Sequence, residues 1–487
     1  MRKSIEDQLE FGAVEIPSIQ LNMKSRDDIV QILLGLQHLY ADPNCREELF
    51  VLLKKLMPPK ISPDLGRPGM HLWNIFVLGT LRLDLNCDYD RLHDLANNHI
   101  KIRQMLGHGP FREQPDYSLQ TIKDNVSLFT TDILDKINQV VVKSGHQLVN
   151  RKEGEALQGK CDSFVFETNV RFPTDIQLLF EACRKTLTLA ARSCRDHGFT
   201  DLRKSHSWLT KLKRQYHIVR KAKHSTSKDE EKQKIQNDYM VKMHELYLKV
   251  ASSLIQKVKN TVAVLQFVTS RQVIEAIESY LVHADRQVDQ IRRRVIFGEV
   301  IPHSEKVFSL FEPHTEWISK GKAGVPVELG LRVCIVEDQY RFILYHHVME
   351  QQTDDQVAVF MVKESQTRYP ELNQCSYDQG FHTPDNQLKL RELLDYVILP
   401  KKGRLSKEQA LHEHSDRFVQ ARRQHSAVES AINALEVHGL DVCPDHGLVA
   451  FKRYTALAIV SRNIQRLGAI ILDQHHQRRS QASAKAA

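Results

Sequence analysis

The chain has 487 residues, a formal net charge of +8 and a sequence pI near 8.9, with 41% hydrophobic and 26% charged residues. This composition is ordinary for a globular protein, and the length allows about three domains. No apolar run reaches the ~18–20 residues of a membrane span, and the opening "MRKSIEDQLE" is too charged for a signal peptide. Eight cysteines without a paired spacing favour reduced thiols over a disulfide framework. We therefore expect a cytoplasmic protein with no membrane segment and no disulfides.

The first part of the chain, residues 1–155, carries apolar residues at helical spacing. The expected helices are 26–40, 46–57, 70–85, 88–97 and 99–106, and a long one from Ser118 to about Leu148. Short helices joined by tight turns suit a helix-turn-helix-like DNA reader, and they suit an ordinary helical bundle equally well. We predict a helical N-terminal DNA-binding domain at 1–155.

The stretch "CDSFVFETNVRFPTD" (161–175) predicts a strand with an acid at its start. Side chains alternate along a strand, so Asp162 shares a face with Phe164 and Phe166. A carboxylate that faces a core is unfavourable unless it is paired or binds a cation. We therefore expect a positive group, in the first place a metal ion, beside Asp162.

Residues 176–299 contain almost no strand signal and predict a helical insertion, with helices near 176–196, 228–265 and 270–295. Between Asp201 and Lys223 stand eight Lys/Arg and one acid, interleaved with His206, Trp208, Tyr216 and His217. A basic stripe with aromatics suits a phosphate backbone and unstacked bases, although a solvated helix face has the same composition. Within it we assign DNA binding to Lys211, Lys213 and Arg214.

Strands resume after the insertion. The expected strands are 327–336, 341–348, 372–377 and 396–400, and the expected helices are 354–369, 384–394 and 416–437. Together with the first strand they predict an α/β domain with a mixed sheet, formed by 156–175 plus 300–440. We expect a C-terminal helix within 441–473 that packs on this domain, and a disordered tail at 474–487.

Two further acids complete a candidate site. Asp378 directly follows the strand 372–377, and groups at the ends of adjacent parallel strands converge at the carboxyl edge of a sheet. If that strand pairs with the first one, Asp162 and Asp378 become neighbours, and a divalent cation would relieve their repulsion. Glu429 lies on a polar line of the helix 416–437 together with Arg422, which can hold a phosphate.

Other cations flank the expected strands. Lys401, Lys402 and Arg404 follow the buried strand 396–400, and Lys320 and Lys322 precede the strand 327–336. Both groups suit DNA contact, and both suit simple solvation.

Four segments resemble those of bacterial insertion-sequence DDE transposases, with the ISNCY group as the nearest match. They are "CDSFVFETNVRFPTD", "WISKGKAGVPVELGLRV", "SYDQGFHTPDNQ" and "RRQHSAVESAINALEVHGLDVCPDHG". The resemblance extends from about residue 70 to 472. It implies an RNase H-like catalytic domain in which Asp162, Asp378 and Glu429 hold two Mg²⁺ ions, with Mn²⁺ able to substitute.

The resemblance departs from the pattern around the glutamate. Some related transposases place Tyr, Arg and Lys at seven before, four before and seven after it, where this chain has Arg422, His425 and Glu436. We assign Arg422 and His425 to DNA contact.

The resemblance implies an enzyme that cleaves phosphodiesters at transposon ends and joins the 3′-hydroxyl ends to target DNA. Its partners would be double-stranded DNA, as terminal inverted repeats and target, and a second copy of the chain on DNA. Such a protein would be associated with the bacterial nucleoid. Two rivals stay open: a metal-dependent RNase H-like nuclease without strand transfer, and a non-catalytic DNA-binding repressor derived from a transposase.

Overall fold

The computed structural model describes residues 3–5, 12–57, 69–109, 117–222, 229–319 and 326–486, which divide into two compact units. Unit 1 comprises Met1–Asn169 and Ile318–Ala487, and unit 2 comprises Val170–Trp317. Lys320 and Lys322, assigned to DNA contact from the sequence, lie outside the described residues.

Unit 1 begins with helices close to the expected ones. They are α1 (Asp28–Ala41), α2 (Pro43–Lys54), α3 (Leu72–Asp84), α4 (Tyr89–Asn98), α5 (Ile100–Met105), α6 (Leu119–Val126) and α7 (Thr131–Leu148). The single long helix from Ser118 to Leu148 is wrong, because Thr130 adopts an extended conformation and its side chain accepts a hydrogen bond from the backbone N–H of Ile133. Thr130 is thus the N-cap of a second helix. Ser118 caps the first in the same way, by accepting from the N–H of Thr121.

The centre of unit 1 is a mixed sheet, which has seven strands within the described residues. They are β1 (Leu157–Thr168), β2 (Glu316–Ser319), β3 (Val327–Glu337), β4 (Ile343–Met349), β5 (Leu372–Tyr377), β6 (Tyr396–Ile398) and β7 (Val442–Cys443). The order is β2-β3-β1-β5-β6, with β4 beside β3 and β7 beside β1. β1 is antiparallel to β3 and parallel to β5, which confirms an α/β fold with a mixed sheet.

Six helices belong to the C-terminal part of unit 1. They are α12 (Asp354–Arg368), α13 (Pro384–Leu393), α14 (Lys407–Glu413), α15 (Asp416–His425), α16 (Ala427–Leu435) and α17 (Leu448–Ala486). The single helix expected at 416–437 is interrupted at Ser426, whose hydroxyl donates to the carbonyl of Arg423. Such a bond competes with the helical hydrogen bonds. Where a disordered tail was expected at 474–487, α17 continues as helix to Ala486.

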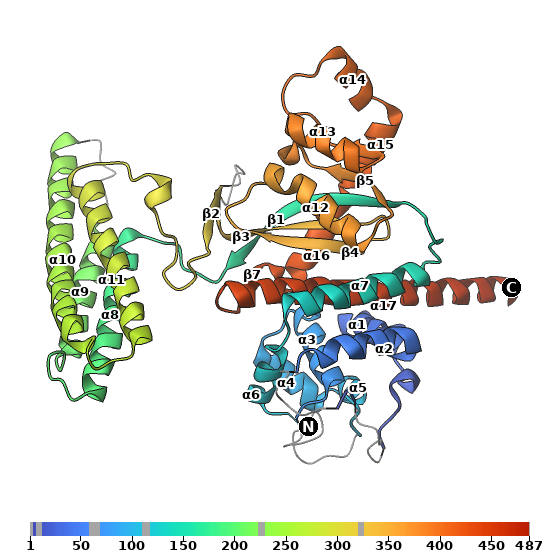
Figure 1. The fold of residues 1–487 in the computed structure, drawn as a ribbon, viewed down its shortest axis with the longest axis horizontal. Coiled ribbons are helices and arrows are strands. Elements are labelled where there is room, and N and C mark those ends of the chain that lie inside the picture. The colour runs from blue at the N-terminus through green and yellow to red at the C-terminus, as the bar shows by residue number, and fades with distance from the viewer. Residues whose placement is uncertain are drawn as a thin grey trace. The chain divides into compact units, whose positions relative to one another are not determined.

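The helix α17 joins the N-terminal helices to the sheet. α7 and α17 lie side by side between the sheet and α1–α3 (Figure 1). A Cβ on Gly35 of α1 would lie 2.1 Å from the carbonyl oxygen of Ile464, so only glycine permits this approach of α1 to α17. The ring of Phe166 on β1 packs against the ring of Phe451 on α17, with their centroids 4.5 Å apart. The N-terminal helices and the sheet therefore share one hydrophobic core, and no division between units falls at residue 155.

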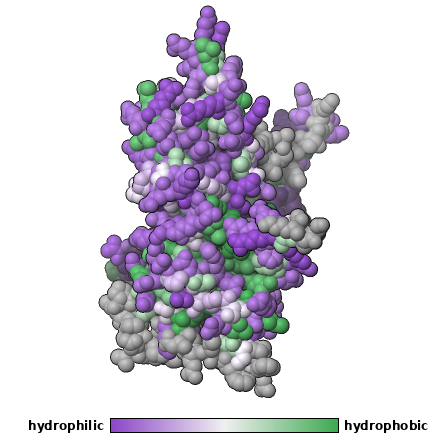
Figure 2. Space-filling model, turned by 90° about the vertical axis from the view of Figure 1, so that its right-hand side faces the viewer, coloured by the Kyte–Doolittle hydropathy of each residue, from purple (hydrophilic) through white to green (hydrophobic). Residues whose placement is uncertain are grey.

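The surface of the chain is largely polar. On the face shown in Figure 2, most of the surface is hydrophilic and hydrophobic side chains form smaller patches. None of the described helices combines the length and apolar character needed to cross a membrane. All eight cysteines are free and buried.

Unit 2 consists mainly of four helices around its own core (Figure 1). They are α8 (Asp175–Asp196), α9 (Ser205–Lys221), α10 (Glu230–Leu265) and α11 (Arg271–Ile291). Leu179, Leu254 and Ile277 are fully buried in this core. The chain therefore leaves the sheet after β1, builds a separate helical unit and returns at β2.

Candidate active site

Two of the three expected acids stand beside each other on neighbouring strands, Asp162 within β1 and Asp378 directly after the end of β5. In the parallel pair β1–β5, Cys161 is in register with Tyr377, so Asp162 and Asp378 occupy the next position on each side. Asp162 is half-buried on the same strand face as Phe164 and Phe166, whereas Asp378 is exposed. The fold thus brings together two residues that are 216 positions apart in the chain.

The electrostatics of Asp162 reflect a cluster of carboxylates. Its pKa is raised from 3.8 to about 7, first by burial and then by the negative charges of Asp378, Asp354 and Glu429. The backbone N–H of Ser163 donates to Asp162 Oδ1 at 2.8 Å and opposes this shift. The neighbouring charges therefore disfavour the ionised form of Asp162.

Glu429, the third expected acid, lies in the first turn of α16 and is exposed. Because the helix is interrupted at Ser426, Glu429 and Arg422 belong to different helices rather than to one continuous polar line. α16 packs against β1, and the charge of Glu429 acts on Asp162. Glu429 thus belongs to the same electrostatic cluster as the two aspartates.

The sequence analysis missed a fourth acid, Asp354. It is the first residue of α12, and its Oδ1 accepts a hydrogen bond of 2.6 Å from the hydroxyl of Ser163. A Cβ built on Gly380 would lie 3.3 Å from Asp354 Oδ2, so this carboxylate also lies beside the turn after Asp378. The only signal in the sequence was an acid at the start of the helix after a hairpin. Such acids are common there because they complement the helix dipole.

The donor set fits a hard divalent cation. Four carboxylates supply oxygen ligands of the kind that Mg²⁺ prefers, and a bound cation would offset the repulsion that adds to burial in raising the pKa of Asp162. As they stand, no three His, Cys, Asp or Glu side chains within the described residues are grouped closely enough to hold a metal ion. The described side chains therefore supply suitable ligands without already forming a compact coordination shell.

His425, which we assign to DNA contact from the sequence, is only partly accessible in the structure. It is half-buried at the end of α15, with its Nδ1 at 3.0 Å from the hydroxyl of Ser376. Its Nε2 is buried and has no hydrogen-bond partner among the described residues. Burial lowers the pKa of His425 from 6.5 to about 4, so the ring is neutral at pH 7. It packs beneath the site rather than offering a positive charge to DNA.

Several of the other expected cations do face solvent near the acids. Arg422, Lys402 and Arg404 are exposed, and none of them forms an ion pair within the described part of the chain. The carbonyl of Lys401 accepts a hydrogen bond of 2.8 Å from Nε2 of Gln379, the residue after Asp378. The loop that carries Lys402 and Arg404 is therefore fastened beside Asp378. The ammonium of Lys401 itself donates a hydrogen bond of 2.7 Å to Oε1 of Gln409.

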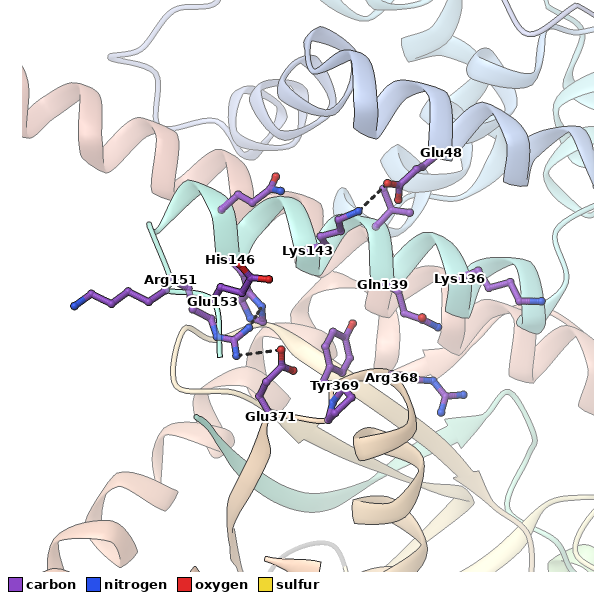
Figure 3. A pocket seen from close by; sticks show the side chains of 14 residues that line it. Glu48, Lys136, Gln139, Lys143, His146, Arg151, Glu153, Arg368, Tyr369 and Glu371 are labelled. Carbon is purple, nitrogen blue, oxygen red and sulfur yellow. Dashed lines mark hydrogen bonds and ion pairs between the residues drawn. The ribbon is translucent and has the colours of Figure 1, made fainter. Parts of the chain in front are cut away.

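A pocket elsewhere in unit 1 has different chemistry. It has a volume of about 610 Å³, and residues of α7 and the segment before β5 line it (Figure 3). None of the four acids lines this pocket, and several of its cations form ion pairs with acids of the same chain. Lys143 pairs with Glu48 at 2.7 Å, and Arg151 pairs with Glu371 at 3.8 Å. We therefore place the candidate active site at Asp162 and Asp378, on β1 and after β5, rather than in this pocket.

The remaining expected DNA contacts, Lys211, Lys213 and Arg214, are exposed on α9 of unit 2.

Comparison of the chain with family models, curated proteins and solved structures found no match.

Proposed function

We propose that this chain is a DDE transposase with an RNase H-like catalytic domain. It would cleave phosphodiesters at transposon ends and join the 3′-hydroxyl ends to target DNA. The observation that carries the proposal is the parallel register of β1 and β5, which puts Asp162 and Asp378 side by side, with the charge of Glu429 acting on Asp162. An adjacent strand pair with an acid on a following helix is the arrangement that the sequence resemblance implies.

In this proposal the carboxylates of Asp162, Asp378 and Glu429 hold two Mg²⁺ ions, and Mn²⁺ can take their place. When bound, such ions activate an attacking oxygen and stabilise the leaving oxygen of a phosphoryl displacement. Asp354 acts beside them by fixing Ser163 next to Asp162.

The exposed cations around the acids would bind the phosphates of the DNA. A DNA phosphate that approaches four carboxylates is repelled unless positive groups accompany it. Arg422, Lys402 and Arg404 are exposed and unpaired in the described structure, so they are available to bind the phosphates that flank the scissile bond.

The wider assembly follows from the same proposal. The helices of residues 1–155 would recognise the terminal inverted repeats, and Lys211, Lys213 and Arg214 of unit 2 would contact double-stranded DNA. Joining two ends requires two active sites, so the chain would act as a homodimer on DNA. It would work in the bacterial cytoplasm at the nucleoid.

The test is cleavage of labelled DNA that contains the element end, with and without Mg²⁺, by the wild type and by Glu429→Gln. The matched control is Glu408→Gln, which removes an exposed acid of α14 that has no partner in the described structure. We expect metal-dependent nicking that is lost in Glu429→Gln and kept in Glu408→Gln, followed by joined products when target DNA is added.

Each rival has its own outcome in this experiment. Nicking without joined products would indicate a nuclease. Binding without any nicking, equal in wild type and Glu429→Gln, would contradict the catalytic proposal and leave a DNA-binding repressor.

A further inference from the structure

The net positive charge of the chain comes from unit 2. Residues 170–317 contain 26 Lys/Arg and 17 Asp/Glu, a net charge of +9, whereas the rest of the chain contains 42 and 43, a net charge of −1. The basic character of the protein is therefore a property of unit 2, and a polyanionic partner would be attracted there first.

Within unit 2, the cations differ in how they are partnered. Away from α9, several exposed cations lie in ion pairs: Arg192 with Asp196 at 3.9 Å, Lys259 with Asp285 at 2.8 Å and Arg271 with Glu275 at 2.6 Å. Others, such as Lys234 and Lys242 of α10, are exposed without an ion pair among the described residues.

The helix α9 differs from its neighbours in having no acidic residue of its own. It contains no acid from Ser205 to Lys221 and carries five Lys/Arg. Across the described ranges, none of these five forms an ion pair. Lys211 and Arg220 only approach the rings of Trp208 and Tyr216. Like charges concentrated on one helix without counter-charges raise the free energy of that helix, which an external anion would lower.

The cations of α9 share the outward face. Ser207, Thr210, Arg214, His217 and Lys221 recur at steps of three and four residues, and all five are exposed. Lys211 and Lys213 flank this line and are exposed too. A helix of 17 residues is about 25 Å long, the length of roughly seven base-pair steps of 3.4 Å.

The side chains of Trp208 and Tyr216 on α9 face the core of unit 2. Tyr216 stacks on Phe180 of α8, with ring centroids 4.9 Å apart and planes 20° apart. Tyr216 and Trp208 both pack against the core of unit 2. They are therefore not available as platforms on which unstacked bases could lie, as the sequence alone suggested. The outward line also contains no apolar side chain that could enter a lipid layer.

We propose that the exposed face of α9, centred on Arg214, His217 and Lys221, binds the phosphate backbone of duplex DNA without reading its bases. The choice of DNA as the polyanion rests on the proposed function. Such a surface would hold flanking or target DNA of any sequence, while sequence recognition lies elsewhere in the chain.

The experiment compares two triple variants of the full chain. One is Lys213→Gln, Arg214→Gln and Lys221→Gln on α9. The control is Arg192→Gln, Lys259→Gln and Arg271→Gln, which removes the same charge from the same unit but from ion-paired positions. Fluorescence anisotropy measures the affinity for random-sequence duplex DNA between about 50 and 300 mM KCl, a range over which phosphate contacts make binding strongly salt-dependent. EDTA is present throughout, so that the binding does not depend on catalysis.

We expect the α9 variant to lower the slope of log Kd against log salt by about three, one for each phosphate contact, equally for unrelated duplex sequences. The control variant should retain the wild-type slope. Equal losses in both variants would overturn the proposal. So would tighter binding of the wild type to single-stranded DNA, to RNA or to phosphatidylserine vesicles than to duplex DNA.

The two proposals fail separately. Loss of duplex binding in the α9 variant, with no metal-dependent nicking in the wild type, supports the role of α9 and contradicts the transposase. Nicking by the wild type, with unchanged duplex binding by the α9 variant, contradicts the role of α9 alone.

Discussion

The hydroxyl of Ser163 donates a hydrogen bond of 2.6 Å to Oδ1 of Asp354. This bond joins β1, directly beside Asp162, to the first residue of α12. Asp354 also contributes to the raised pKa of Asp162, and its other oxygen lies beside Gly380 in the turn after Asp378. The side chain of Asp354 thus lies beside both expected aspartates, the one within β1 and the one after β5.

We predict that Asp354→Asn lowers the rate of metal-dependent nicking by about 10–100-fold, the range found when a partner of a metal ligand is removed. The asparagine keeps the shape of the side chain but removes its charge. The matched control is Asp355→Asn, the next acid in the first turn of the same helix, which should keep the wild-type rate. Equal rates for wild type and Asp354→Asn would show that Asp354 has no part in the site.

The raised pKa of Asp162 predicts a pH-dependent stability. Since the folded pKa is about 7 and the ordinary value is 3.8, the folded state keeps a proton that the unfolded state releases. Wild-type stability should therefore fall as the pH rises from about 4 to 7. Asp162→Asn removes this effect. In metal-free buffer at pH 8 it should be more stable than wild type, by at most about 4 kcal/mol.

Urea-induced unfolding between pH 4 and pH 8, in EDTA, measures this difference. The gain should vanish near pH 4, and Asp355→Asn should show no comparable gain at pH 8. A constant difference between wild type and Asp162→Asn across the whole pH range would mean that the carboxylate of Asp162 is not the group that titrates.

Divalent metal should reverse this instability. We expect Mg²⁺ or Mn²⁺ to raise the melting temperature at pH 8, with a gain of about 2.7 kcal/mol when the ion is present at 100 times its dissociation constant. The gain should shrink at pH 5.5, below the raised pKa of Asp162, because protons compete with the metal. Thermal unfolding with and without EDTA provides the measurement. Asp378→Asn should lose the gain and Glu408→Gln should keep it. If Asp378→Asn responds like wild type, the metal binds elsewhere.

The loop after β6 supplies a test of phosphate binding near the acids. Lys402→Gln with Arg404→Gln should weaken binding to end DNA and lower the salt slope by about two, since each cation is expected to contact one phosphate. The control is Lys136→Gln with Lys389→Gln, two exposed lysines of unit 1 in ion pairs with Asp132 and Asp385. Anisotropy titrations at several KCl concentrations compare the two double variants. An equal loss of DNA affinity in both would reflect the net charge of the protein rather than this loop.

Helices and strands with strong periodicity were predictable from the sequence. The alternation in Val327–Glu337 gave β3, and the buried run near Tyr396–Ile398 gave β6. The interruptions of helices were not, because they depend on single hydroxyl groups. Thr130 caps α7, and the hydroxyl of Ser426 bonds back to the chain between α15 and α16. A short polar residue inside a helical pattern does not reveal in advance which carbonyl or N–H it will choose.

The candidate site was predictable in part. The neighbouring positions of Asp162 and Asp378 followed from strand alternation and parallel pairing, which are local rules. Asp354 was missed because its role depends on how α12 packs beside β1, and a pattern in one helix does not encode that packing. For the same reason the orientation of Tyr216 was misjudged, since only the contact with Phe180 shows that its ring faces inward.

The interruption of the sheet by unit 2 has a consequence for how the chain is made. β1 is synthesised at Leu157–Thr168, but its antiparallel neighbour β3 begins only at Val327, and its parallel neighbour β5 at Leu372. α17, which covers the shared core, begins later still, at Leu448. During synthesis β1 therefore has neither neighbouring strand until the whole of unit 2 has been made. A nascent chain that stops before Leu448 would hold the acids without the helix that covers their core, so the proposed activity would require synthesis to continue through α17.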